Sequence, residues 1–281
     1  MTLDRRVTPA RADLAAARLR GQVEAARFCE PTPMEIAAGV TALRREPRHD
    51  AGLETQALRG QGVDIYEVTD EGWAWGQLLA DGYVGWIAAE ALAHADPAPL
   101  THRVVAPRTF VYPAPDMKTA VLAALPLGAG VRVTQSAGGF VFIAPYGYVF
   151  AAHLAAWDQP ALDYVSVAEQ FLHVPYLWGG KTSEGLDCSG LVQTTLAAAG
   201  VDAPRDADMQ ERALGRAIAH DVPLERGDLV FWRGHVGIMR DAQTLLHANA
   251  HAMSVTSEPL AGAQARIAAA GGGEITGIRR L

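Results

Sequence analysis

The spacing of hydrophobic and polar residues changes twice along the chain, which predicts three kinds of region. In residues 1–37, short apolar residues are mixed with charges, which predicts a polar arm with one or two helical patches around residues 14–26. From about residue 39 to 157, short alternating runs are separated by turns, which predicts antiparallel strands. Beyond residue 160, helical spacing and strand-like runs occur together, which predicts a mixed α and β region.

The strand-rich region contains an internal repeat. Segments 82–86 (GYVGW) and 147–151 (GYVFA) align, which predicts two tandem copies of one small β-barrel, residues 38–97 and 98–158. We expect most aromatic residues here to fill the barrel cores. Tyr83 follows the hairpin signal Asp81-Gly82, so its side chain could reach a neighbouring domain, although a place in the core is an equal alternative.

A thiol is predicted at the start of a helix in the last region. Apolar residues recur at helical spacing from Leu191 to Ala199, and Gly200 ends the run, so Cys188 lies in the first turn. The helix terminus favours a thiolate there, and Asp187 can cap the helix. The alternative is that Cys188 is a small buried core residue.

Two strands further along supply histidines that suit a thiol nucleophile. His235 begins one strand and His247 ends the next, so antiparallel pairing predicts that the two side chains lie side by side. A helix packed on this sheet by its first turn would bring Cys188 to His235. Such a nucleophile requires a base, and the base requires a partner that fixes its tautomer.

A zinc site is the other use of one cysteine and two histidines. The chain has no close ligand pair of the C-x₂-C kind, so we expect neither a metal nor another cofactor. The other histidines and Cys29 have no matching partner in the pattern, and we interpret them as structural or surface residues.

Composition narrows the functional classes. The 281 residues are 49% hydrophobic and 20% charged, with a net charge of −7, which argues against a nucleic-acid or anionic-membrane partner. Two cysteines form no disulfide framework, and the N-terminal residues contain no uninterrupted apolar run. We therefore expect a cytoplasmic protein without a membrane span, and a monomer.

Four motifs together resemble those of the NlpC-type cysteine peptidases. They are the segments 187–192 (DCSGLV), 227–232 (GDLVFW), 235–238 (HVGI) and 246–248 (LHA). The resemblance covers about residues 160–281 and implies a papain-like α+β fold for a catalytic domain over residues 159–281. Both preceding barrels resemble bacterial SH3-like domains, although that pattern is less specific.

The resemblance also implies roles for individual residues. Cys188 would be the nucleophile, His235 the general base and acid, and His247 the group that orients His235. Tyr176 would help to hold the oxyanion together with the backbone N–H of Cys188. The residues that would line the substrate site are Trp178, Asp187 and Ser189.

The order of domains resembles the intracellular branch that trims murein peptides during cell-wall recycling. Its members cut the γ-D-glutamyl–diamino acid bond of a murein tripeptide or longer stem peptide that has a free N-terminal L-Ala. By this resemblance Asp206 would pair with the substrate ammonium, and Tyr83 would block the site beyond it. The alternative for Asp206 is an exposed helix N-cap. Ala207 replaces the serine common in that branch, so one hydroxyl is missing.

Two other functions remain open at this stage. An amidase or acyltransferase would use the same thioester with another acceptor. A non-catalytic murein-binding module would need only the SH3-like domains, but it would have no need of a complete set of nucleophile, base and orienting residue.

Overall fold

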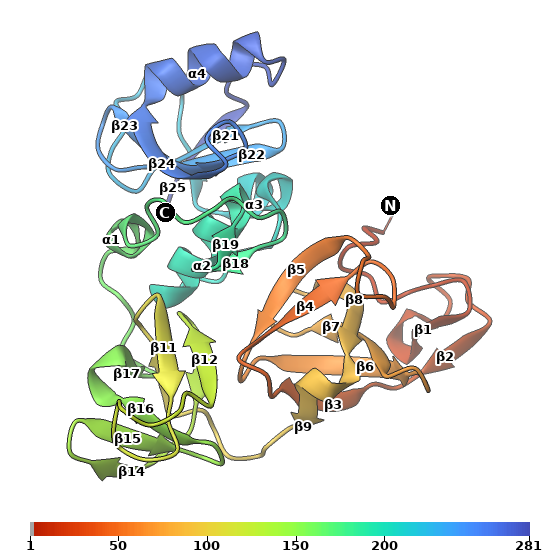
Figure 1. The fold of residues 1–281 in the computed structure, drawn as a ribbon. Coiled ribbons are helices and arrows are strands. Elements are labelled where there is room, and N and C mark those ends of the chain that lie inside the picture. Colours follow the sequence, from red (N-terminus) through yellow and green to blue (C-terminus); the bar gives the residue numbers. More distant parts are fainter. Residues whose placement is uncertain (1–2) are drawn as a thin grey trace. The chain divides into compact units, whose positions relative to one another are not determined.

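The computed structural model describes residues 3–281 and divides the chain into two compact units, Met1–Asp158 and Gln159–Leu281 (Figure 1). The first unit consists of strands and short 3-10 turns, whereas the second combines four helices with strands. Within the described residues, no helix has the length and apolar character needed to cross a membrane.

The N-terminal arm is not helical. It contains two short parallel strands with one 3-10 turn, namely β1 (Leu14–Ala16), η1 (Ala17–Leu19) and β2 (Arg27–Cys29). The helical patches predicted around residues 14–26 are therefore wrong. Leu14 is fully buried, and Arg18 donates a hydrogen bond of 2.7 Å to the Tyr66 hydroxyl, so tertiary contacts override the local helical preference.

A seven-stranded antiparallel sheet follows, in the order β5-β4-β8-β7-β6-β3-β9. Its strands are β3 (Thr32–Ile36), β4 (Val40–Arg44), β5 (Leu53–Leu58), β6 (Gly62–Val68), β7 (Trp73–Leu78), β8 (Val84–Ala88) and β9 (Leu92–His94), with the 3-10 turn η2 (Ala89–Ala91). The sheet thus begins at Thr32, earlier than the expected boundary at residue 38, because β3 pairs with both β6 and β9.

The rest of the first unit contains three smaller sheets. Their strands are β10 (His102–Val104), β11 (Arg108–Val111), β12 (Ala123–Pro126), β13 (Gly130–Val131), β14 (Val133–Ala137), β15 (Phe140–Ile143), β16 (Gly147–Phe150) and β17 (Leu154–Ala156), with η3 (Ala151–His153). The order strand, 3-10 turn, strand recurs in β8-η2-β9 and β16-η3-β17, at the two aligned sequence segments. That both copies close into barrels stays a prediction.

The second unit is built on a six-stranded antiparallel sheet in the order β20-β25-β21-β22-β23-β24. The strands of this sheet are β20 (Arg216–Ala217), β21 (Leu229–Trp232), β22 (His235–Met239), β23 (Thr244–Asn249), β24 (Ser254–Pro259) and β25 (Gly277–Arg280). The other elements are α1 (Tyr164–Glu169), the hairpin β18 (Lys181–Thr182) and β19 (Gly185–Leu186), α2 (Cys188–Ala198), α3 (Ala207–Ala213) and α4 (Leu260–Ala269).

Helices cover both faces of this sheet (Figure 1). Helix α2 packs on β22 and β23, and its side chains Leu191 and Val192 are fully buried. Helix α4 packs on β23 and β24, where Ala263 joins Leu245 and Trp232 in a hydrophobic cluster. Burial of each large apolar side chain contributes about 2 kcal/mol, so the layers fix α2 and β22 against each other.

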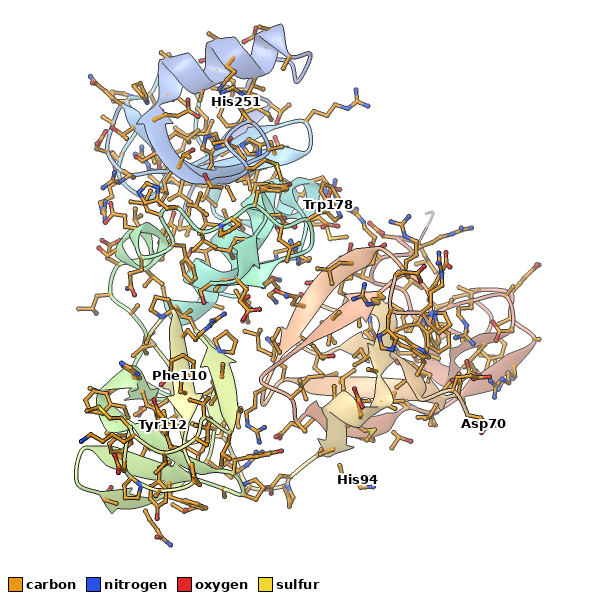
Figure 2. All side chains as sticks on the ribbon, viewed as in Figure 1. Asp70, His94, Phe110, Tyr112, Trp178 and His251 are labelled. Carbon is orange, nitrogen blue, oxygen red and sulfur yellow. The ribbon has the colours of Figure 1, made fainter. Side chains whose placement is uncertain are left out.

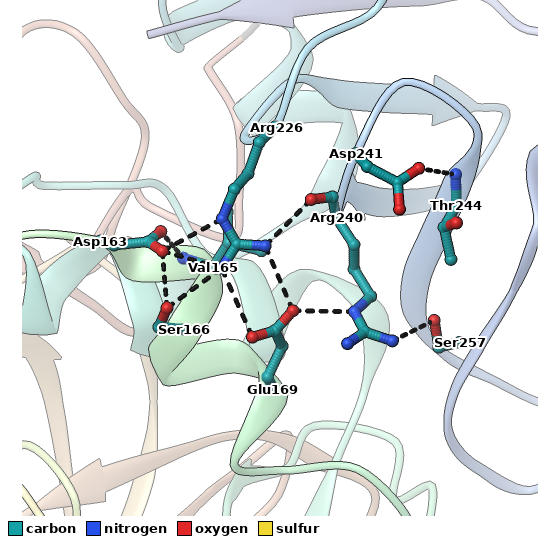
Figure 3. Close-up of polar contacts among 9 residues, drawn as sticks. All are labelled: Asp163, Val165, Ser166, Glu169, Arg226, Arg240, Asp241, Thr244 and Ser257. Carbon is teal, nitrogen blue, oxygen red and sulfur yellow. Dashed lines mark hydrogen bonds and ion pairs between the residues drawn. The ribbon is translucent and has the colours of Figure 1, made fainter.

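A network of ion pairs joins α1 to the sheet (Figure 3). The Arg226 guanidinium contacts Asp163 at 2.8 Å and Glu169 at 3.2 Å, and Arg240 contacts Glu169 at 2.8 Å. Although burial acts in the opposite direction, hydrogen bonds from Ser166 and Arg226 lower the pKa of Asp163 to about 2. The network is partly exposed, whereas the polar contacts at the start of α2 are buried.

Candidate active site

Cys188 is the first residue of α2, and Asp187 caps that helix. The Asp187 carboxylate accepts hydrogen bonds of 2.7 Å from the backbone N–H of Gly190 and of 2.7 Å from that of Gly179. The predicted cap is therefore confirmed. The backbone N–H of Cys188, in the first turn, has no acceptor within the helix and can donate to a developing oxyanion.

Glycines allow the preceding loop to lie against this helix turn. A Cβ atom at Gly190 would lie 2.1 Å from the carbonyl oxygen of Gly180, and one at Gly180 would lie 2.3 Å from that of Gly185. Any side chain at these positions would push the loop away from Cys188. The close approach of two backbones explains the glycines in the motif around the thiol.

A buried arginine, which the sequence analysis did not single out, completes the start of α2. Arg205 is 1% exposed and binds both carboxylate oxygens of Asp187, at 2.9 and 2.6 Å, and the Ser189 hydroxyl at 2.9 Å. Gln210 adds a bond of 2.9 Å to the Ser189 carbonyl. Asp187 and Ser189, expected to line the substrate site, are thus buried and have structural partners. Whether they also contact substrate stays a prediction.

The two histidines lie side by side, as the strand pattern predicts. His235 Nε2 and His247 Nδ1 are 2.8 Å apart. Between them in the sheet, Gly237 has no side chain, and a Cβ atom there would lie 3.2 Å from that of His247. The missing side chain leaves room for the two rings to meet.

The thiol lies beside the start of the strand that carries His235. Helix α2 packs on β22, and the backbone of Val236, the residue directly after His235, is close enough to the Cys188 thiol to lower its pKa. Because Nε2 of His235 faces His247, Nδ1 is the nitrogen that remains to accept a proton. The expected nucleophile, base and orienting residue are therefore grouped at one place in the second unit.

Burial determines the protonation of this group in the ligand-free protein. Burial and the Asp187 carboxylate raise the pKa of the Cys188 thiol to about 12. Burial, His247 and Arg266 lower the pKa of His235 to about 3. Both shifts favour a neutral thiol and a neutral imidazole, which opposes the effect of the helix terminus on the thiol.

Tyr176 has the properties of a hydrogen-bond donor near the thiol. Burial, Cys188 and Asp187 raise the pKa of the Tyr176 hydroxyl above its ordinary value, so the hydroxyl keeps its proton. Trp178, three residues before β18, is 69% exposed (Figure 2). Both belong to the loop that precedes α2, and their contacts with substrate stay predictions.

Asp206 begins α3 without capping it. It occupies the N-cap position, but its side chain makes no capping hydrogen bond. This argues against the N-cap alternative. The preceding residue, Arg205, is held by Asp187, so Asp206 is placed next to the contacts at the start of α2.

Tyr83 belongs to the first unit, and its surroundings favour the core alternative. Its side chain is 4% exposed and is part of the hydrophobic cluster that includes Leu78 and Ile87. Its backbone N–H donates to the Asp81 carboxylate at 3.0 Å. A role for Tyr83 at the substrate site stays a prediction.

The sequence analysis also missed Glu258. His247 Nε2 lies 2.8 Å from Glu258 Oε1, and Arg266 from α4 binds the same oxygen. A signal was present, because strand alternation after the turn at residues 250–253 places Glu258 on the same face as Thr256, which pairs with His247. Among residues 3–281, no group of three or more His, Cys, Asp or Glu side chains could hold a metal ion.

Comparison with known proteins matches two parts of the chain. The model of the NlpC/P60 family matches residues 173–270, which include the thiol and both histidines. The chain contains an NlpC/P60 domain. A second family model, the bacterial dipeptidyl-peptidase SH3 domain, matches residues 43–92, which confirms an SH3-like domain within the expected range 38–97.

Two curated proteins from Bacillus are similar to this chain. Gamma-D-glutamyl-L-lysine dipeptidyl-peptidase of Bacillus subtilis (strain 168) is 29% identical over 226 residues, which cover 71% of this chain and 73% of the relative. The protein of the same name from Bacillus cereus is 29% identical over 205 residues, which cover 64% of this chain. The matched part covers 60% of that relative, less than two thirds of its length.

A solved structure supports the fold. An NlpC/P60 family protein from Bacillus cereus ATCC 10987 has a TM-score of 0.74 and 21% sequence identity, and the match covers 88% of this chain and 99% of that one. The papain-like NlpC/P60 part of the expected fold is thus confirmed. At this identity the likeness concerns the fold alone.

Proposed function

We propose that this protein is a cysteine peptidase that cuts the γ-D-glutamyl–diamino acid bond of murein peptides with a free N-terminal L-Ala. The observation that carries the proposal is the grouping of Cys188 with the hydrogen-bonded pair His235 and His247. The names of the two Bacillus relatives supply the bond class.

Acylation begins from the neutral pair. As the Cys188 sulfur attacks the γ-carbonyl carbon of D-glutamate, Nδ1 of His235 takes the thiol proton. The backbone N–H of Cys188 and the Tyr176 hydroxyl donate to the oxyanion of the tetrahedral intermediate. The carbon–nitrogen bond then breaks, His235 gives its proton to the leaving amine of the diamino acid, and a thioester remains on Cys188.

Deacylation repeats the same proton transfers with water. His235 takes a proton from the attacking water, the carbon–sulfur bond breaks, and the proton returns to the thiolate of Cys188. The products are the dipeptide with a free γ-carboxylate and the regenerated thiol. An imidazole that is neutral at rest can act as a base in both steps.

Recognition of the free N-terminus is a separate part of the specificity. A dipeptidyl-peptidase releases the first two residues, so its site must recognise the substrate ammonium. We assign this to Asp206, whose carboxylate does not cap α3 and lies next to the residue that Asp187 holds. An ammonium taken out of water without a counter-ion would lose several kcal/mol.

The test uses L-Ala-γ-D-Glu-L-Lys, the same peptide with meso-diaminopimelate in place of lysine, and N-acetylated forms of both. We expect cleavage of the free-amine peptides, with kcat/KM lowered at least about tenfold by acetylation. Asp206→Asn should lose this preference, whereas the control Asp208→Asn, on the exposed side of α3, should keep it. Equal cleavage of both forms would remove the amine requirement, and cleavage of none would contradict the proposed peptidase.

The remaining parts of the proposal rest on the sequence. They are a role in cell-wall recycling, a cytoplasmic location, a monomer and a second SH3-like domain over residues 98–158. The relation between substrate class and location can be tested by fractionating cells that produce the protein and assaying each fraction for the peptidase.

A further inference from the structure

The series of hydrogen-bonded side chains that begins at His235 extends beyond His247. Glu258, on β24, accepts a hydrogen bond from His247 Nε2 through its Oε1, and Arg266 of α4 donates to the same oxygen. These contacts come from four neighbouring elements, because His235 lies on β22 and His247 on β23. Glu258 and Arg266 lie outside the set expected from the sequence motifs.

The contacts determine which nitrogen of each ring carries a proton. As a carboxylate, Glu258 can accept but cannot donate, so His247 must carry its proton on Nε2. Its Nδ1 is then an acceptor, and the 2.8 Å contact requires His235 to donate from Nε2. Nδ1 of His235 is left without a proton, which is the form that can act as a base.

The opposite arrangement would disable the base. If His247 carried its proton on Nδ1, it would donate to Nε2 of His235. The neutral His235 ring would then carry its proton on Nδ1 and could not take one from the thiol. Because His247 is fully buried, it has no solvent contact that could choose between the two arrangements.

We propose that Glu258, held by Arg266, is a positioning residue that fixes the tautomers of His247 and His235 in the base-competent arrangement. The proposal rests on the proposed peptidase function for its kinetic consequence, but not for the tautomers themselves. Besides the rings themselves, the charged groups that act on them are Glu258 from β24 and Arg266 from α4.

The chain offers a matched control for a substitution of Glu258. The side chain of Glu169 is 27% exposed, the same value as for Glu258, and it is likewise ion-paired with arginine. Glu169 contacts Arg226 and Arg240 but is not hydrogen-bonded to a histidine (Figure 3). Glu258→Gln and Glu169→Gln each remove one partly buried charge, and only the first removes the acceptor-only partner of His247.

The experiment measures the imidazole nitrogens by NMR in the full-length protein labelled with ¹⁵N-histidine. We expect Nε2 protonated and Nδ1 unprotonated for both His235 and His247 in the wild type and in Glu169→Gln. In Glu258→Gln the amide can donate as well as accept, so both tautomers of His247 should be populated. With peptide substrate, kcat of this variant should fall about 10- to 100-fold with little change in KM.

Several results would overturn the inference. One is a wild-type protein in which His235 carries its proton on Nδ1. This observation requires neither a folded variant nor a substrate. Others are unchanged tautomers in Glu258→Gln, changed tautomers without loss of kcat, or an equal loss of kcat in Glu169→Gln. A wild-type protein that cleaves no peptide would contradict the peptidase proposal. The NMR measurement of the tautomers would still test whether Glu258 positions the two histidines.

Discussion

At the start of α2 the buried polar groups carry full charges, whereas between β22 and β23 they are neutral. Asp187 and Arg205 are both almost completely buried and are joined by two hydrogen bonds. His235 and His247 are also buried, but burial lowers the pKa of each, so both rings are neutral at pH 7. Charge appears on the histidine side only at Glu258 and Arg266, which are partly exposed.

The difference separates two tasks. A buried ion pair is rigid, and removal of one partner strongly destabilises the protein. Such a pair is suited to fixing the backbone around the thiol. A neutral imidazole held in one tautomer can take a proton and give it back, as the proposed acylation and deacylation steps require. We therefore expect substitutions on the first side to change stability, and those on the second to change proton transfer.

The largest effect should come from the nucleophile. Cys188→Ala removes the atom that forms the thioester, and we expect kcat/KM to fall about 10⁵-fold or more. The side chain is small, so the melting temperature should change little. Peptide cleavage and differential scanning calorimetry measure the two quantities. Activity retained within about tenfold would contradict a thioester mechanism.

The ion pair should contribute mostly to stability. Arg205→Met leaves the Asp187 carboxylate buried without its cation, and we expect the free energy of unfolding to fall by about 3–5 kcal/mol. Arg212→Met, at an exposed ion pair on α3, should change it by less than about 1 kcal/mol. Urea denaturation measures both. Equal losses in the two variants would show that burial of Asp187 is not decisive.

A smaller effect is expected at the oxyanion. Tyr176→Phe keeps the ring and removes one donor, which should lower kcat about 100-fold, or about 3 kcal/mol in the activation free energy. The value of KM should change little, since the donor acts on charge that develops in the transition state. A loss confined to KM would assign Tyr176 to substrate binding instead.

The effect that is smallest at neutral pH, and that grows only in acid, concerns stability. Because the folded pKa of His235 is lowered to about 3, the unfolded chain binds more protons between that value and about 6.5. Stability should therefore fall as the pH decreases through this window. His235→Gln should flatten the fall, and the exposed control His251→Gln should not. Equal slopes in both variants, measured by thermal unfolding against pH, would contradict the buried neutral imidazole.

Parts of the site could be predicted because their causes are local in sequence. The cap, thiol and glycines around Cys188 are neighbours in the chain, and the pair His235 and His247 follows from one hairpin. Glu258 depends on the register of a further hairpin, and Arg205 on how a loop returns to α2, neither of which periodicity specifies. The prediction for the N-terminal arm was wrong for the same reason, because Arg18 is hydrogen-bonded to Tyr66 on β6, far away in the sequence.

The protonation state of the Cys188 thiol could not be predicted from the sequence either. Position in the first helical turn favours a thiolate, whereas burial of Cys188 favours the thiol, and burial depends on how α2 packs on β22. The residue types indicate the class of reaction, whereas tertiary packing affects the protonation state of the thiol. We therefore propose that His235 acts as a base during the attack, rather than that a preformed ion pair reacts.

The central claim, a thioester between Cys188 and the γ-carboxyl of D-glutamate, is tested most directly with an activated ester. With the γ-(p-nitrophenyl) ester of L-Ala-D-Glu, acylation should outpace hydrolysis, so the acyl-enzyme accumulates. We expect a burst of nitrophenol and, by mass spectrometry of the digested protein, the dipeptidyl group on Cys188. An adduct on another residue, or ester turnover at an equal rate by Cys188→Ala, would contradict it.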